Sequence, residues 1–251
     1  GYHRRAAEGA AGEAEVFFGD WFVRSAINQG LPVATAGTPQ AFDALVARRE
    51  RAPETVVFIP TAAARTSADA ERLRGWLDRG IPAILYGPAS SLHPTLLADL
   101  GLALDAPLSG DLTLVDAAGT GIGALIHDPV GSAGGIAARF AGKDGAPGDP
   151  LQRYGVVQAA VAGKTSTVAQ PDLSDDARAY CVTAAPAGRA PLIWIRGTNP
   201  FETRPDTGHL ALKPTPRPAT APDGRPNVDA GRLCVEALGW LGYTIAVRHD
   251  E

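Results

Sequence analysis

The stretch ERLRGWLDRGIPAILYGPAS (residues 71–90) predicts a helix, a turn and a strand in succession. Leu73, Trp76 and Leu77 recur at helical spacing, so residues 67–80 predict an amphipathic helix that ends at a glycine. Residues 81–87 follow as a short apolar strand, and small residues then lead to the next helix start. This layout is typical of a nucleophile elbow, a sharp strand-to-helix turn that holds a reactive side chain above a sheet.

The residues around this stretch continue the alternation of strands and helices. Apolar runs predict strands, and helical spacing with start and stop signals predicts helices. The alternation favours a parallel sheet covered on both faces, so we expect an α/β fold with a flavodoxin-like, doubly wound, mostly parallel sheet. The predicted strands are 14–19, 31–37, 55–61 and 81–87, and the predicted helices are 20–30, 38–51, 67–80 and 93–102.

Two of the predicted helices begin with recognisable capping residues. Thr38 with Pro39 at the first helical position is expected to open the second helix. Ser67 is expected to cap the third helix without a strict capping box, because Ala70 stands three residues later.

The second half of the chain is less regular. Residues 105–155 are rich in Gly, Asp and Pro and predict an irregular insertion or a pair of antiparallel strands. Residues 199–227 form a long Pro-rich segment that predicts a loop. We interpret residues 1–251 as a single domain with a tail or frayed helix (1–14), a first core half (15–104), the insertion (105–155) and a second half (156–251). The insertion has candidate strands at 111–116 and 123–128, and the second half has predicted strands at 155–163, 166–170, 179–185 and 191–197 and an amphipathic helix at 228–243.

Composition excludes several classes of partner. The chain has 251 residues, 45% of them hydrophobic, and a net charge of -4, so nucleic acid is not an expected partner. No apolar run approaches the roughly 18 residues that a membrane span needs, and no signal peptide is visible. The chain has no Met and begins GYHRR, which indicates a piece of a longer protein, so the compartment stays undetermined. Heavy use of Ala, Gly, Pro and Arg is associated with bacterial genomes.

Two glycine-containing motifs resemble cofactor loops only in part. AGKTST (162–167) contains Gly-Lys-Thr, but Gln158 stands where a phosphate-binding loop needs its first Gly. AAGTGIGALI (117–126) has the spacing of a dinucleotide fingerprint, but Pro129 interrupts the helix that should follow. We therefore predict no cofactor.

No metal site is predicted either. The histidines at 93, 127 and 209 are scattered, and no Cys or carboxylate stands at metal spacing beside them. Cys181 and Cys234 make no disulfide framework and are interpreted as core thiols.

The segments 55–61, 67–80 and 81–90 together resemble the glutamine amidotransferase-like (class I) fold. More specifically, they resemble the trimerisation domain of family 42 bacterial β-galactosidases. PLIWIRGTN (191–199) followed by VDAGRLCVEALGWLGY (228–243) is similar to the last strand, loop and helix of such domains. The resemblance covers roughly two thirds of the chain and is one of pattern, because no single motif is diagnostic and residues 105–155 match nothing in it.

The resemblance implies a Cys at the elbow of an active amidotransferase, where a His and a carboxylate activate the thiolate that attacks glutamine. Here the elbow reads Tyr86, Gly87, Pro88, Ala89 and Ser90, without a Cys. Pro88 lacks the backbone N–H that an oxyanion hole would use, and no Gly-x-Ser-x-Gly surrounds Ser90. We therefore interpret the elbow as degenerate and predict no catalytic residue.

The expected function is that of a non-catalytic module of a larger bacterial carbohydrate-active enzyme, with a glycoside hydrolase as parent. Such a module would assemble sister copies and shape a neighbouring active site. Its expected partners are other domains of the parent chain, further copies of itself and possible carbohydrate, with no membrane. Trp76 and Trp240 are available for contacts, although helix-face aromatics favour the core. The predicted interface or ligand residues are Trp194, Phe201, Glu202, Arg204 and His209.

Two alternatives stay open. The first is a hydrolase or amidotransferase with an unrecognised site built from Asp20, Ser90, His93 and Glu202 near predicted strand ends. The second is a carbohydrate-binding module that uses Trp194, Phe201 and Arg204.

Overall fold

The structure is a computed structural model that describes residues 2–3, 27–28, 30–31, 35–36, 39–48, 55–108, 112–115, 136–140, 152–161, 177–186, 188–196 and 230–241. The described helices are α2 (Pro39–Ala47), α3 (Ser67–Asp78), α4 (Pro94–Asp99) and α5 (Ala230–Trp240), with 3-10 turns η2 (Thr61–Ala64) and η3 (Ala89–Ser91). The described strands are β1 (Tyr2–His3), β2 (Thr35–Ala36), β3 (Val57–Pro60), β4 (Ala83–Tyr86), β5 (Leu102–Leu108), β6 (Leu112–Val115), β7 (Ile136–Phe140), β8 (Gln152–Val161), β9 (Ala177–Ala185) and β10 (Leu192–Ile195).

Eight of the described strands form one mixed sheet in the order β2-β1-β3-β4-β10-β9-β8-β6. The five strands from β2 to β10 pair in parallel, whereas β9, β8 and β6 continue the sheet through antiparallel pairs. Strands β5 and β7 form a separate antiparallel pair. The predicted α/β class with a mostly parallel sheet is therefore confirmed, since parallel pairs make up four of the seven pairings in the large sheet.

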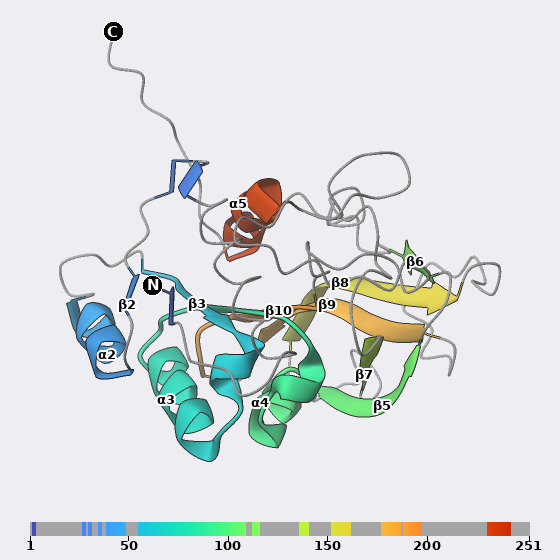
Figure 1. Ribbon diagram of the computed structural model, residues 1–251, viewed down its shortest axis with the longest axis horizontal. Coiled ribbons are helices and arrows are strands. Elements are labelled where there is room, and N and C mark those ends of the chain that lie inside the picture. Colours follow the sequence, from blue (N-terminus) through green and yellow to red (C-terminus); the bar gives the residue numbers. More distant parts are fainter. Residues whose placement is uncertain are drawn as a thin grey trace, which may run out of the picture.

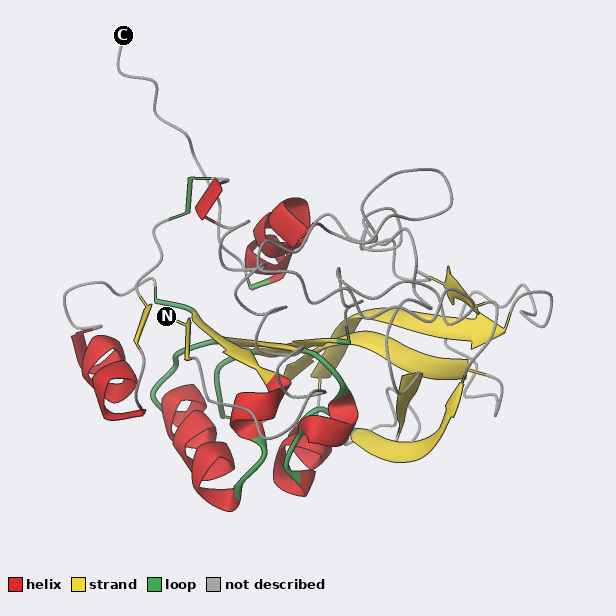
Figure 2. Ribbon diagram, viewed as in Figure 1, coloured by secondary structure: helices red, strands yellow, loops and turns green. Residues whose placement is uncertain are grey.

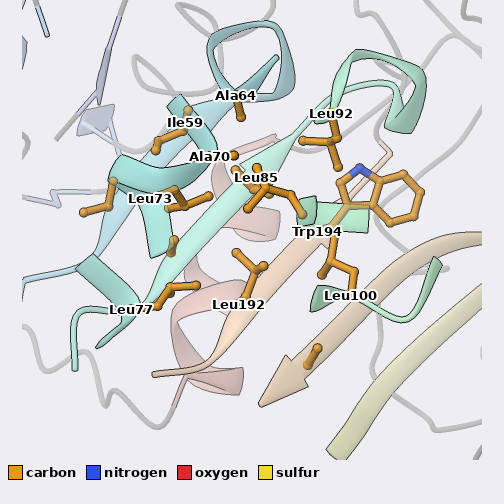
Figure 3. Close-up of a cluster of buried hydrophobic side chains, with 14 of the residues drawn as sticks. Ile59, Ala64, Ala70, Leu73, Leu77, Leu85, Leu92, Leu100, Leu192 and Trp194 are labelled. Carbon is orange, nitrogen blue, oxygen red and sulfur yellow. The ribbon is translucent and has the colours of Figure 1, made fainter. Parts of the chain in front are cut away.

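Helices cover both sides of the large sheet. Figure 1 shows α3 and α4 on one side of the sheet and α5 on the other, and Figure 2 shows the same layers by element type. The side chains of α3 and α4 bury apolar stripes against β3, β4 and β10 in one core cluster. Figure 3 shows this cluster, with Leu85 and Leu192 from the sheet facing Leu73 and Leu77 from α3.

The opposite side of β4 and β10 is buried as well. Ile84 and Tyr86 alternate with the core residues of β4, and Ile193 and Ile195 do the same in β10. All four are at most 2% exposed. This burial on both faces is the reason that residues 81–87 and 191–197 appear as continuous apolar runs, which is typical of central strands in an α/β sheet.

The N-cap of helix α3 lies one residue earlier than the sequence indicated. Thr66, not Ser67, is the N-cap, because the Thr66 hydroxyl accepts the Asp69 amide (3.2 Å) and the Asp69 carboxylate accepts the Thr66 amide (3.3 Å). The pair is a reciprocal capping box with Asp in the place of Glu. The prediction that Ser67 caps the helix was wrong, because a one-residue shift brings Asp69 rather than Ala70 to the third helical position.

Helix α4 is shorter than predicted. The backbone leaves the helix after Asp99, Gly101 has a φ of 64°, and Leu102 already begins β5. The predicted helix over 93–102 is therefore correct only for residues 94–99, because the run of leucines continues without a break into a strand. Pro39 at the first helical position of α2 is confirmed, while its expected cap Thr38 lies outside the described residues.

The described strands of the segment 105–155 divide between the large sheet and the separate pair of β5 and β7. Strand β6 pairs with β8 at the end of the large sheet, and β5 crosses the predicted boundary at residue 105. The guanidinium of Arg178 on β9 donates from Nε and Nη2 to the Ala106 carbonyl (3.1 and 3.0 Å), which fixes β5 to the sheet. The other candidate strand of this segment, 123–128, lies outside the described residues.

The N-terminal residues also depart from the expected tail. Tyr2 pairs in parallel with Thr35 of β2 and with Phe58 of β3, so β1 lies inside the sheet between these strands. The tail interpretation was wrong for Tyr2 and His3, because the alternation of apolar residues cannot identify a strand as short as two residues.

Candidate functional site

The carboxyl ends of β3, β4 and β10 meet at one edge of the sheet. Pro60 and Ile195 both pair in register with Tyr86, so Thr61, Gly87 and Arg196 follow their strands at the same level. Open α/β sheets place ligands outside this edge, because loops diverge there and helix starts point towards it. We therefore consider this edge, which contains the predicted elbow, as the candidate site.

Gly87 has the backbone geometry of a sharp elbow. Its φ of 127° lies in a region that other residues rarely adopt. Its amide donates to the Ile195 carbonyl (3.0 Å), and its own carbonyl accepts the indole N–H of Trp194 (3.0 Å). A Cβ at this position would collide with the hydroxyl of Thr61. Both the backbone torsion and the space beside Cα therefore favour glycine at position 87.

Three of the residues that follow Gly87, namely Pro88, Ser91 and Leu92, offer no free amide for an oxyanion hole in the described part of the chain. Pro88 has no N–H, and the next turn is η3, in which the amides of Ser91 and Leu92 donate to the carbonyls of Pro88 and Ala89. Catalytic oxyanion donors must instead point outward at the reacting atom. The backbone therefore makes the turn of a nucleophile elbow, while the amides of Ser91 and Leu92 are used inside that turn.

The side chains of the elbow lack an activated nucleophile among the described residues. Ser90 is exposed, but no hydrogen bond joins it to the nearby His93 in the residues that the structure describes. The Nδ1 atom of His93 accepts the Thr95 amide (3.3 Å) as the N-cap of α4. Ser91 is buried and accepts a long hydrogen bond from the guanidinium of Arg65 (3.4 Å). A serine needs an adjacent general base to attack a substrate, and His93 serves the helix instead.

Trp194 was predicted as an interface or ligand residue, and this prediction was wrong. Its side chain is fully buried at 0% exposure and packs in the cluster of Figure 3 beside Leu92 and Leu100. Its only polar atom, the indole nitrogen, is bonded to Gly87. An apolar strand such as 191–197 does not reveal which of its aromatics could reach the surface, because both of its faces are buried.

Two residues at this edge were missed by sequence reasoning. Thr61 is 1% exposed, and its hydroxyl has no hydrogen-bond partner among the described residues. Arg196 is 4% exposed and brings a cation to the same end of the sheet, where its amide donates to the Tyr180 carbonyl (2.7 Å). The sequence could have identified both residues by their position, since each is the first polar residue after a buried strand.

Trp76 and Cys181 follow the core interpretation, whereas Trp240 follows it only in part. Trp76 is 4% exposed and packs against Phe42 of α2 with ring centroids 5.0 Å apart. Trp240 at the end of α5 is partly exposed. Cys181 is a buried thiol in the core, as predicted. The side chain of Cys234 lies outside the described residues.

The other predicted site residues cannot be placed. Asp20, Phe201, Glu202, Arg204 and His209, and the whole loop 199–227, lie outside the described residues. The same holds for His127 and for the motifs at 117–126 and 162–167. Within the described part of the chain, no group of three His, Cys, Asp or Glu residues is close enough to bind a metal ion. None of the described helices is long and apolar enough to span a membrane.

Comparisons with protein-family models, with curated proteins and with solved structures returned no match to this chain.

Proposed function

We propose that this chain is a non-catalytic, amidotransferase-like module of a larger bacterial carbohydrate-active enzyme, in which it assembles sister copies and shapes a neighbouring active site. The observation that carries the proposal is the elbow at Gly87. It has the positive φ and the anchored backbone of a nucleophile-bearing turn, yet no Cys follows it, Pro88 has no backbone N–H, and no hydrogen bond joins Ser90 to His93 in the described residues.

The strand order supports the finer assignment of the fold within this proposal. The parallel strands run β2-β1-β3-β4-β10, which in chain order is the 2-1-3-4-5 arrangement of flavodoxin-like sheets. The amidotransferase-like fold that the sequence resembles is wound in this way, and its nucleophile follows a central strand. Here β4 is that central strand, because β3 and β10 pair with it on either side.

The buried side chains at the edge support a structural rather than a catalytic role. Trp194, which lies next to the elbow, is bonded to the Gly87 carbonyl and fills the core below it. A ligand-binding site at this edge would need a pocket with a few polar side chains that converge on the ligand. In the described residues, the hydrogen bonds of the elbow instead connect the strand ends to one another.

Two measurements on the purified chain test the proposal. The first is turnover of glutamine and of nitrophenyl glycosides, for which we expect no rate above that of buffer. Ser90→Ala is the matched variant, because Ser90 is exposed and its removal leaves the buried contacts of the elbow in place. Turnover that the wild-type chain shows and Ser90→Ala loses would contradict the proposal and favour a hydrolase with an unrecognised site.

The second measurement is the mass of the particle in solution by sedimentation velocity over a wide concentration range. An assembly module should associate, so we expect the average mass to rise towards a multiple of the monomer mass as concentration increases. A chain that stays monomeric at all concentrations would contradict the assembly role. Saturable binding of galactose-containing oligosaccharides by such a monomer would favour a carbohydrate-binding module instead.

A further inference from the structure

We draw no further inference here: the strongest candidate, the buried hydroxyl of Thr61 beside Gly87 at the carboxyl ends of β3 and β4, belongs to the site already described, and nothing in the described part of the chain shows what it would bind.

Discussion

Gly87 is constrained by three neighbours, of which Trp194 and Ile195 lie on β10 and Thr61 follows the end of β3. Its amide is held by Ile195, its carbonyl by the Trp194 indole, and the space beside its Cα by the Thr61 hydroxyl. Each contact restricts a different part of the residue, so a side chain at position 87 cannot be accommodated by a shift of Gly87 or of one neighbour alone. A side chain at this position therefore meets both a torsional cost and a steric one.

We expect Gly87→Ala to lower the free energy of unfolding by about 1–3 kcal/mol from the unfavourable φ alone, with the collision against Thr61 in addition. Urea denaturation followed by circular dichroism measures this difference. Adding Thr61→Ala should restore only the steric part, because the φ of 127° remains. The matched control is Gly75→Ala in α3, where a Cβ meets nothing within 4 Å, and this change should stabilise the chain by about 0.4–1 kcal/mol. Equal stability of Gly87→Ala and wild type would show that the elbow is not strained.

Thr183 offers a second test at the level of a single residue. It lies on β9 opposite Ile193 and is 0% exposed, and its hydroxyl has no hydrogen-bond partner among the described residues. A buried polar group without a partner costs about 1–3 kcal/mol of desolvation. We expect Thr183→Val, which keeps the shape and removes the hydroxyl, to raise the melting temperature in differential scanning calorimetry.

The control for Thr183→Val is the same replacement at Thr61. There the hydroxyl occupies the space that a Gly87 side chain would need, and the bulkier methyl group in its place has less room, so the gain from removing a buried hydroxyl should be smaller. A lower melting temperature for Thr183→Val would mean that its hydroxyl is bonded after all.

At the scale of elements, α3 is capped at its start and connected to its surroundings at its end. Its start is closed by the capping box of Thr66 and Asp69. Its last two turns pair with α4 and with the turn between β9 and β10, because Asp99 of α4 lies 2.9 Å from Arg74 and 3.5 Å from Arg189. Arg189 also pairs with Asp78 at the end of α3, and the Ala190 amide donates to the Leu77 carbonyl. The network joins three elements distant in sequence.

The capping box predicts that alanine substitutions at the adjacent residues Thr66 and Ser67 change the free energy of unfolding by different amounts. Thr66→Ala should lower the free energy of unfolding by about 0.5–2 kcal/mol, because it leaves the Asp69 amide without its acceptor. Ser67→Ala should change it much less, since the exposed Ser67 hydroxyl bonds only the exposed Glu71 carboxylate (3.1 Å) and not the helix backbone. Chemical denaturation of both variants decides the point. A larger loss of unfolding free energy for Ser67→Ala than for Thr66→Ala would show that Ser67 is the N-cap.

At the scale of the molecule, burial is distributed unevenly between the two sheets. Every residue of β4 and β10 is buried, and both strands have neighbours on either side. In β5, by contrast, residues 104–107 are exposed, including the side chain of Leu104 at 45%. Strands buried on both faces open only when the whole domain unfolds, whereas exposed pairs open locally.

This difference predicts the pattern of amide hydrogen exchange. The amides of Ala83–Tyr86 and Leu192–Ile195 should exchange with a single free energy equal to that of global unfolding, which is about 5–15 kcal/mol for a typical domain. The amides of residues 103–105 should exchange with a clearly lower free energy. Native-state exchange measured by mass spectrometry in increasing denaturant tests both expectations. Faster exchange in β4 than in β5 would contradict the assignment of β4 as the central strand.

The amino-acid sequence by itself determined the features that depend on local pattern. The apolar runs at 55–61, 81–87 and 191–197 identified β3, β4 and β10, and helical spacing identified α3. Gly87 was recognised as the elbow because an apolar strand runs directly into Gly-Pro. Periodicity and turn residues suffice for these features, since each is set by residues close together in the chain.

Only the tertiary structure decided the features that depend on long-range pairing. It placed Tyr2 and His3 between β2 and β3, continued the sheet with antiparallel strands, and buried Trp194 under the elbow. It also joined Thr61 and Arg196, 135 positions apart, at the edge with Gly87. The physical reason is that sheet partners and buried contacts are chosen by the packing of the whole chain. A strand buried on both faces has the same apolar pattern whichever neighbour it pairs with.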